Sequence, residues 1–192
     1  MATPRRAGRP PEPTDLRERI LDACLRLLEE PEGAYGVTIA RVTKLAVCTA
    51  PSLYNYWPSR EALLAEASAR GWEHFQRTQA AADDLGAPLD RLRARGTSYL
   101  MFAIEHPNLF SVLFLSRATE GNSSPTFEAL VTDVAEAVRT GALPPVDPRD
   151  RATDLWAAVH GVSVLAYANP AFAEHAAIPT LARLTHALLP PA

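Results

Sequence analysis

Hydroxyl, amide and cationic side chains are concentrated in the stretch that runs from Thr38 to Arg60. Residues 33–60 contain Arg41, Lys44 and Arg60 but no aspartate or glutamate, so this part of the chain is positively charged. Hydroxyl and cationic groups bind phosphate oxygens, and amide groups can bind the edges of nucleic-acid bases. The residue types therefore suit a polyanionic partner, provided that the fold presents them on one surface.

Two short helices joined by a tight turn are expected to present these side chains. Thr38 can cap the first helix, and apolar residues follow it at intervals of three, as one buried face requires. Thr49 can cap the second helix, residues 50–56, which would bury Leu53. A third helix would begin near Ser59. This pattern predicts a helix-turn-helix, whose second helix enters the major groove of DNA.

The polar side chains of this motif divide into two groups according to the part of DNA that they suit. Hydroxyls and cations fix a protein on phosphates without reading sequence, whereas asparagine, serine and small apolar side chains can contact base edges. We assign phosphate contacts to Thr38, Lys44, Thr49, Tyr54, Tyr56 and Arg60. We assign base contacts to Ala50, Pro51, Ser52 and Asn55. Because the second helix has no arginine or lysine, we expect a recognition site that favours A·T pairs.

A basic arm precedes the motif. Residues 1–13 are rich in proline and glycine, contain Arg5, Arg6 and Arg9, and should be disordered in the free protein. Two interpretations stay open: an arm that enters the minor groove beside the main site, or a solvated tail that adds only diffuse charge.

The stretch from Val37 to Leu64 resembles the DNA-binding domain of the TetR family of bacterial transcriptional regulators. The residues that carry the resemblance are Thr38, Ala46, Thr49, Ser52, Leu53, Tyr54, Tyr56, Trp57, Ser59, Arg60, Glu61, Leu63 and Leu64. Two positions depart from the family pattern, since Val47 stands where glycine is usual and Cys48 where valine is usual. A β-branched residue tolerates a tight turn only at negative φ, so we expect a negative φ at Val47.

Composition fits one chain with two functional parts. At 192 residues and a net charge of −3, the chain can bury a core and is not a general binder of polyanions. From Asp83 onward, twelve acidic residues face eight arginines, so local net positive charge coincides with the motif and its arm. The longest apolar run, residues 162–168, is too short for a membrane span, and no apolar stretch follows the N-terminal arginines as it would in a signal peptide. We expect a cytoplasmic protein in which Cys24 and Cys48 are reduced packing residues.

Helical periodicity continues to the end of the chain. We predict an all-α protein of about nine helices: an N-terminal three-helix helix-turn-helix domain and a C-terminal helical domain for ligand binding and dimerisation. The predicted parts are the arm at 1–13, the DNA-binding domain at 14–82 and the second domain at 83–192. The helix from residue 59 to 82 would belong to both domains.

The second domain carries a weaker resemblance to one class of TetR C-terminal domain. It rests on a helix that ends in Glu105-His106-Pro107 and on the Trp156-x-x-x-His160-Gly161 pattern. The resemblance implies an effector pocket and a homodimer formed through the last two helices. Gly161 would allow a close helix approach or leave room for a ligand, and His160 would make either a core hydrogen bond or an effector contact.

Aromatic residues at helical spacing are candidates for the wall of that pocket, although such residues often only form a core. The candidates are Tyr99, Phe102, His106, Phe110, Phe114, Phe127, Trp156 and His160. Aromatic walls with a few polar groups suit a small, mostly apolar or aromatic effector.

These observations together predict a ligand-responsive DNA-binding regulator, a repressor that a small effector releases from a pseudo-palindromic operator. The alternative is a helical small-molecule-binding protein that has lost specific DNA binding. We expect no catalysis, cofactor or metal, because phosphate-binding loops, nucleophile elbows and histidine pairs at ligand spacing on one helix are missing from the sequence.

Overall fold

The computed structural model describes residues 13–115 and 124–189, so Arg5, Arg6 and Arg9 of the basic arm lie outside the described residues. The described chain contains eleven α-helices, one π-helical segment and no strand, which confirms the all-α prediction. The two helices beyond the nine expected are α2 (Gly33–Gly36) and α10 (Pro170–His175). Each is shorter than two turns, so neither leaves a periodic pattern in the sequence.

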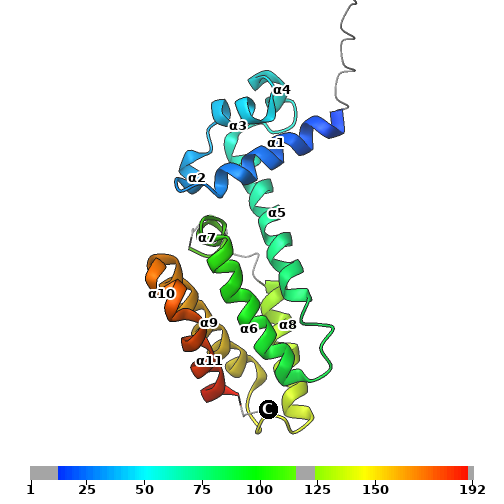
Figure 1. Ribbon diagram of the computed structural model, residues 1–192. Coiled ribbons are helices and arrows are strands. Elements are labelled where there is room, and N and C mark those ends of the chain that lie inside the picture. Colours follow the sequence, from blue (N-terminus) through cyan, green and yellow to red (C-terminus); the bar gives the residue numbers. More distant parts are fainter. Residues whose placement is uncertain (1–12, 116–123, 190–192) are drawn as a thin grey trace, which may run out of the picture. The chain divides into compact units, whose positions relative to one another are not determined.

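The chain folds into two compact units, with the boundary between Ala67 and Ser68. The boundary falls inside α5 (Arg60–Ala80), the helix expected to belong to both domains (Figure 1). In the described residues, no helix is both long and apolar enough to cross a membrane.

The first unit holds α1 (Pro13–Leu28), α2, α3 (Ile39–Ala46), α4 (Ala50–Tyr54) and the start of α5. Its core consists of fully buried aliphatic side chains from every helix longer than one turn. These include Ile20, Leu21, Leu28, Val42, Leu53 and Leu63.

Trp57 closes the end of that core and links it to α5. Its indole Nε1 donates a hydrogen bond of 2.7 Å to Glu66 Oε2, and the Arg17 guanidinium lies 5.3 Å from its ring. Arg17 also forms an ion pair with Glu66. Trp57, which follows α4, therefore contacts both α1 and α5.

The second unit contains the rest of α5 and the helices that follow it. Its helices are α6 (Pro88–Glu105), α7 (Pro107–Phe110), the π-helical segment η1 (Ser111–Leu115), α8 (Ser124–Arg139), α9 (Pro148–Ala168), α10 and α11 (Ala177–Leu188). α9 packs against α6, α8, α10 and α11 and is the central helix of this unit (Figure 1). It begins at Pro148, because Asp147 caps its first turn by accepting hydrogen bonds from the amides of Arg149 and Asp150.

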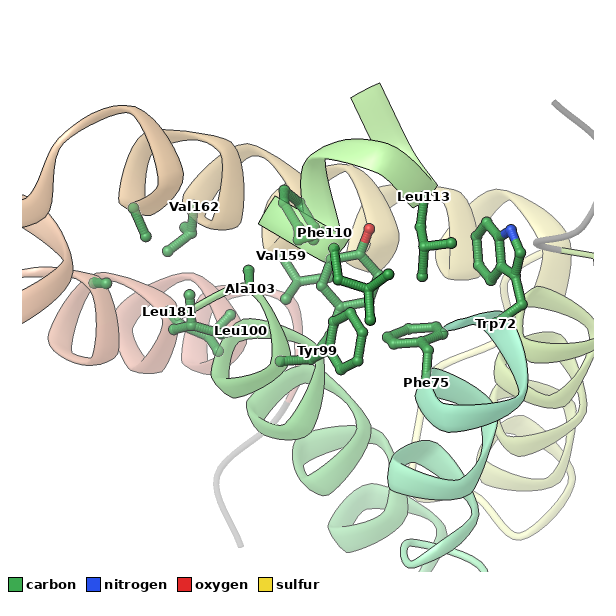
Figure 2. Packing of buried hydrophobic residues seen from close by; sticks show 14 residues of the cluster. Trp72, Phe75, Tyr99, Leu100, Ala103, Phe110, Leu113, Val159, Val162 and Leu181 are labelled. Carbon is green, nitrogen blue, oxygen red and sulfur yellow. The ribbon is translucent and has the colours of Figure 1, made fainter. Parts of the chain in front are cut away.

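A buried aromatic cluster fills the centre of the second unit (Figure 2). Phe75 packs edge-on against Tyr99 and Phe102, with ring centroids 5.3 and 5.1 Å apart. Gly71 lets α5 approach this cluster closely, since a Cβ there would lie 2.9 Å from Leu109 Cδ1. The α7–η1 segment is therefore packed directly on the backbone of α5.

A buried ion network joins α6 to α8. Asp133 of α8, 5% exposed, accepts hydrogen bonds from Arg91 Nε at 2.7 Å and Arg95 Nε at 2.6 Å. Arg91 also pairs with Glu136, and Arg95 pairs with Asp83. The Asp133 carboxylate thus bridges two buried guanidinium groups, and its loss would leave both without their shared partner.

Candidate nucleic-acid interface and ligand pocket

Each helix of the α3–α4 motif is capped at its start by one threonine. Thr38 Oγ1 accepts a hydrogen bond of 3.2 Å from the amide of Arg41, and Thr49 Oγ1 accepts one of 3.3 Å from the amide of Ser52. α3 buries Val42 and Ala46, and α4 buries Leu53. The two caps, Val42 and Leu53 are as the sequence indicated, whereas Leu45, at the end of the apolar face expected for α3, is 44% exposed and Ala46 is buried instead.

The turn between the helices corrects one expectation. Val47 has φ +52° and ψ +57°, which is the left-handed region, so the prediction of a negative φ is wrong. The reason is the end of α3: the amide of Cys48 donates to Thr43 O at 3.0 Å and the amide of Val47 donates to Lys44 O at 3.4 Å. This hydrogen-bond pair is a Schellman motif, which requires a left-handed residue between helix and turn.

The strained residue is held by its surroundings rather than by its own side chain. Val47 is 81% exposed, and Arg19 of α1 donates hydrogen bonds to the carbonyls of Ala46 and Val47, the latter at 3.1 Å. The left-handed conformation costs an L-residue roughly 1–2 kcal/mol, and a β-branched residue is among the least suited to it.

Replacing Val47 with glycine should therefore stabilise the protein by about 1 kcal/mol, because glycine adopts the left-handed region without strain but loses more chain entropy on folding. Urea denaturation of the wild type and of Val47→Gly measures the gain. Val47→Ala is the matched control, since it keeps a Cβ and should gain less. Equal effects of the two variants would contradict the strain argument.

The candidate DNA contacts lie mostly on the surface of the first unit. Pro51, Tyr54 and Asn55 of the α4 region are exposed, and Ala50, Ser52 and Tyr56 are half-buried. Three further candidates outside α4 and α5 are exposed as well: Thr38, Lys44 and Thr49.

Arg60 differs from the other candidates because its guanidinium is already engaged. It donates a hydrogen bond of 2.6 Å to Val37 O through Nε and another to Ala34 O through Nη2. It therefore holds the backbone that leads into the Thr38 cap. Tyr35, between these two carbonyls, is 94% exposed and was not singled out from the sequence. In the sequence, only its position between Gly33 and Gly36 could have indicated that this side chain is exposed.

A cavity of about 390 Å³ lies within the second unit. It is lined by residues of α5, α6, η1, α8, α9 and α11. Its aromatic walls are Phe75, Tyr99, Phe114, Phe127 and Trp156. Its polar lining includes Gln79, Arg95, Thr126, Glu128, Arg149, Thr153 and Thr185.

Four of the eight predicted pocket residues line this cavity and four do not. Tyr99, Phe114, Phe127 and Trp156 line it. The other four are Phe102, His106, Phe110 and His160.

Helix geometry explains why these four lie elsewhere. Tyr99 shares one face of α6 with the cavity residues Leu92, Arg95 and Gly96, at spacings of three, four and seven. Phe102 is 2% exposed and packs against His74 and Phe75 instead. Phe110 is fully buried between Tyr99 and Phe114. His106 lies at the end of α6, where its ring faces His74.

His160 forms a second layer behind the cavity wall. Its Nδ1 lies 2.8 Å from the Tyr99 hydroxyl oxygen, and its ring stacks on Trp156 at a centroid distance of 5.3 Å. Burial lowers the pKa of His160 and raises the pKa of Tyr99, so both groups are neutral near pH 7. The core hydrogen bond is thus one of the two roles expected for His160, and it orients a cavity-lining phenol.

Two further sequence expectations can be placed. Gly161 is exposed and nothing in its own chain lies within 4 Å of a Cβ built there, so no helix of the described subunit approaches it closely. Cys24 is buried and Cys48 half-buried, and both are free thiols. Burial raises the pKa of Cys24 to about 12, which keeps it protonated and unreactive.

The described chain therefore combines a helix-turn-helix unit, typical of DNA-binding proteins, with a helical unit that contains a largely apolar, partly open cavity. Residues 20–67 match the family described as bacterial regulatory proteins, tetR family. Residues 92–188, about half of the chain, match the tetracyclin repressor-like C-terminal domain. The chain belongs to the TetR family and is a DNA-binding transcription regulator.

Individual relatives are distant. The chain is 27% identical over 161 residues to the nucleoid occlusion factor SlmA of Vibrio campbellii, covering 77% of this chain and 82% of that protein. Its fold resembles AibR in complex with isovaleryl coenzyme A and operator DNA, with a TM-score of 0.69, 19% identity and coverage of 93% and 100%. It also resembles FadR from Bacillus subtilis in complex with stearoyl-CoA, with a TM-score of 0.73, 12% identity and coverage of 91% and 98%.

Proposed function

We propose that this protein is a homodimeric repressor that leaves a pseudo-palindromic operator when a small, mostly apolar or aromatic effector enters the cavity of the second unit. The observation that carries the proposal is the aromatic cavity of about 390 Å³ in a chain whose helix-turn-helix keeps Pro51, Tyr54 and Asn55 at the surface. A cavity of that volume suits a drug-sized ligand.

Sequence reading is assigned to the outer face of α4. Asn55 can bind adenine in a bidentate manner, Ser52 can bond either kind of base edge, and Pro51 can contact a thymine methyl. Thr38, Lys44, Thr49 and the tyrosine hydroxyls would hold phosphates and set the register. A twofold dimer then requires half-sites about one helical turn apart, roughly 34–36 Å.

The dimer interface is assigned to α9 and α11. Ala157, Gly161 and Leu165 are exposed on α9 at intervals of four, so they form one continuous face. Ile178, 56% exposed, adds an apolar side chain from α11, and the open space at Gly161 would admit a partner helix. Exposed apolar faces of this kind typically mark interaction surfaces.

The effector class is narrowed by the lining and by the relatives. The lining is mostly apolar, with aromatic and aliphatic side chains, and its polar groups are threonine hydroxyls, the Gln79 amide, two arginines and the Glu128 carboxylate that pairs with Arg149. Two fold relatives carry acyl-CoA ligands in their crystal structures. Acyl-CoA thioesters and the corresponding free acids are therefore the first compounds to screen, followed by apolar aromatic compounds.

Effector and operator would be coupled through α5, which is continuous across the boundary between the units. Phe75 and Gln79 of α5 line the cavity, and Arg60 at its start holds the backbone before Thr38. A coupling free energy of about 1–3 kcal/mol would change operator affinity by about 5- to 150-fold, and the operator would lower effector affinity equally.

Binding of the full-length protein to genomic fragments, including its own upstream region, at two salt concentrations tests the DNA-binding part. Selective retention that survives competitor DNA is the expected result. If binding to all fragments is instead lost equally at the higher salt concentration, only the basic arm contacts DNA. That result would favour a small-molecule-binding protein without an operator.

Filling the cavity should separate effector response from DNA binding. Gly96 lines the cavity, and a Cβ built there meets no atom within 4 Å, so the side chain of Gly96→Leu should occupy part of the ligand volume. We expect at least a tenfold weaker effector response with little change in operator affinity, measured by fluorescence anisotropy. Gly96→Ala provides the graded comparison and should weaken the response less. A Gly96→Leu protein with a full response would place the effector elsewhere.

A further inference from the structure

Two histidines that are far apart in sequence face each other in the second unit. His74 lies on α5 and His106 ends α6, and their Nε2 atoms are 3.4 Å apart. The two rings are perpendicular, with centroids 5.0 Å apart, and Phe102 packs against both. Both side chains are half-buried.

We propose that His74 and His106 form a binding site for a borderline transition-metal ion, with Zn²⁺, Co²⁺, Ni²⁺ and Cu²⁺ as the ions of matching chemistry. Imidazole nitrogens prefer these ions, whereas Mg²⁺ and Ca²⁺ require oxygen ligands. Zinc–nitrogen bonds of about 2.0–2.1 Å in a tetrahedral centre place two nitrogens about 3.3–3.4 Å apart. The observed Nε2 separation matches that edge, so the spacing of the two nitrogens suits the coordination of one ion.

The site would be open rather than closed. The described residues contain no group of three or more histidine, cysteine, aspartate or glutamate side chains arranged for a metal. Water or a small ligand would therefore complete the coordination, in contrast to a structural zinc site with four protein ligands. The ion would replace the proton between the two Nε2 atoms, and it would bind reversibly.

Because of the position of the histidine pair, a bound ion would affect the walls of the cavity. His74 is adjacent to Phe75, which lines the cavity, and His106 directly precedes the α7–η1 segment that carries Phe114. A bound ion would fix α5 to the end of α6 and stiffen two of the cavity walls. This second step rests on the proposed effector function, whereas binding of the ion itself does not.

The test uses the untagged full-length protein, freed of metal with a chelator. Titration with Co²⁺, followed by visible absorption, and with Zn²⁺, followed by calorimetry, should give one ion per chain. His74→Ala and His106→Gln should each lower the affinity tenfold or more. Zn²⁺ should also raise the melting temperature of the wild type but of neither variant.

Exposed histidines on other helices serve as matched controls. His175→Ala and His186→Ala remove the same side chain from α10 and α11 and should leave ion binding unchanged. Circular dichroism verifies that each variant is folded. Absence of binding by the wild type, or affinity that survives both His74→Ala and His106→Gln, would overturn the proposal and leave the pair as a hydrogen bond. Neither result would bear on operator or effector binding.

Discussion

Replacing Asp133 with asparagine should destabilise the second unit by about 3 kcal/mol and lower its melting temperature by about 10 °C. Asp133 is 5% exposed and accepts hydrogen bonds from Arg91 through Oδ1 and from Arg95 through Oδ2. An asparagine keeps the size of the side chain but removes its charge. Its amide group would also place N–H donors against a guanidinium that can only donate.

The expected loss lies at the lower end of the range for broken buried ion pairs, because both arginines keep a second carboxylate. Arg91 still pairs with Glu136, and Arg95 still pairs with Asp83. These carboxylates are 38% and 61% exposed, so solvent screens them and they replace only part of the lost interaction.

Asp90→Asn is the matched control for this prediction. Asp90 forms a 3.1 Å ion pair with Arg93 one turn away on the surface of α6, and its side chain is 57% exposed. Loss of such a pair should cost at most about 0.5 kcal/mol. Urea denaturation of both variants measures the difference. Equal and small effects would show that the buried network contributes specificity of packing rather than stability.

The sequence was sufficient for the helices because most long helices have a cap or a proline at their start and a continuous apolar stripe. Thr38, Thr49 and Asp147 act as helix caps in the structure, the first two as predicted. The ion network was missed because Arg91 and Asp133 are 42 residues apart, and no local pattern indicates which charges become buried.

Only some of the cavity-lining residues were predicted, again because helix packing is not visible in the sequence. Helical spacing groups residues on one helix, and the aromatic character of α6 was visible in Tyr99 and Phe102. The face that each residue occupies relative to α5 depends on helix packing, so Tyr99 lines the cavity while Phe102 packs in the core. Val47 was misjudged because a rule for isolated residues was applied where a Schellman motif dictates the conformation.

Introducing a charge on the exposed face of α9 should abolish dimerisation and, with it, tight operator binding. Leu165 is 54% exposed in the subunit and lies on the same face as Gly161 and Ala157. If that face meets its symmetry mate, as proposed, Leu165→Glu brings two carboxylates close to the twofold axis. Like charges juxtaposed in an interface cost several kcal/mol, which is enough to dissociate a dimer at micromolar concentration.

The effect on DNA follows from the symmetry of the complex. A dimer places two heads on one operator, so the second head binds at a high effective concentration. A monomer loses that advantage, and operator affinity should fall by about 100-fold or more. Analytical ultracentrifugation and anisotropy at fixed salt measure the two consequences on the same samples.

Leu85→Glu separates loss of the interface from the added charge. Leu85 is 39% exposed in the segment before α6, outside the two helices assigned to the interface, and its replacement changes the net charge by the same amount. This variant should remain dimeric and should bind the operator almost as the wild type does. A dimeric Leu165→Glu protein would exclude the central face of α9 from the interface. A monomeric one that still binds the operator tightly would show that a single head is sufficient for recognition.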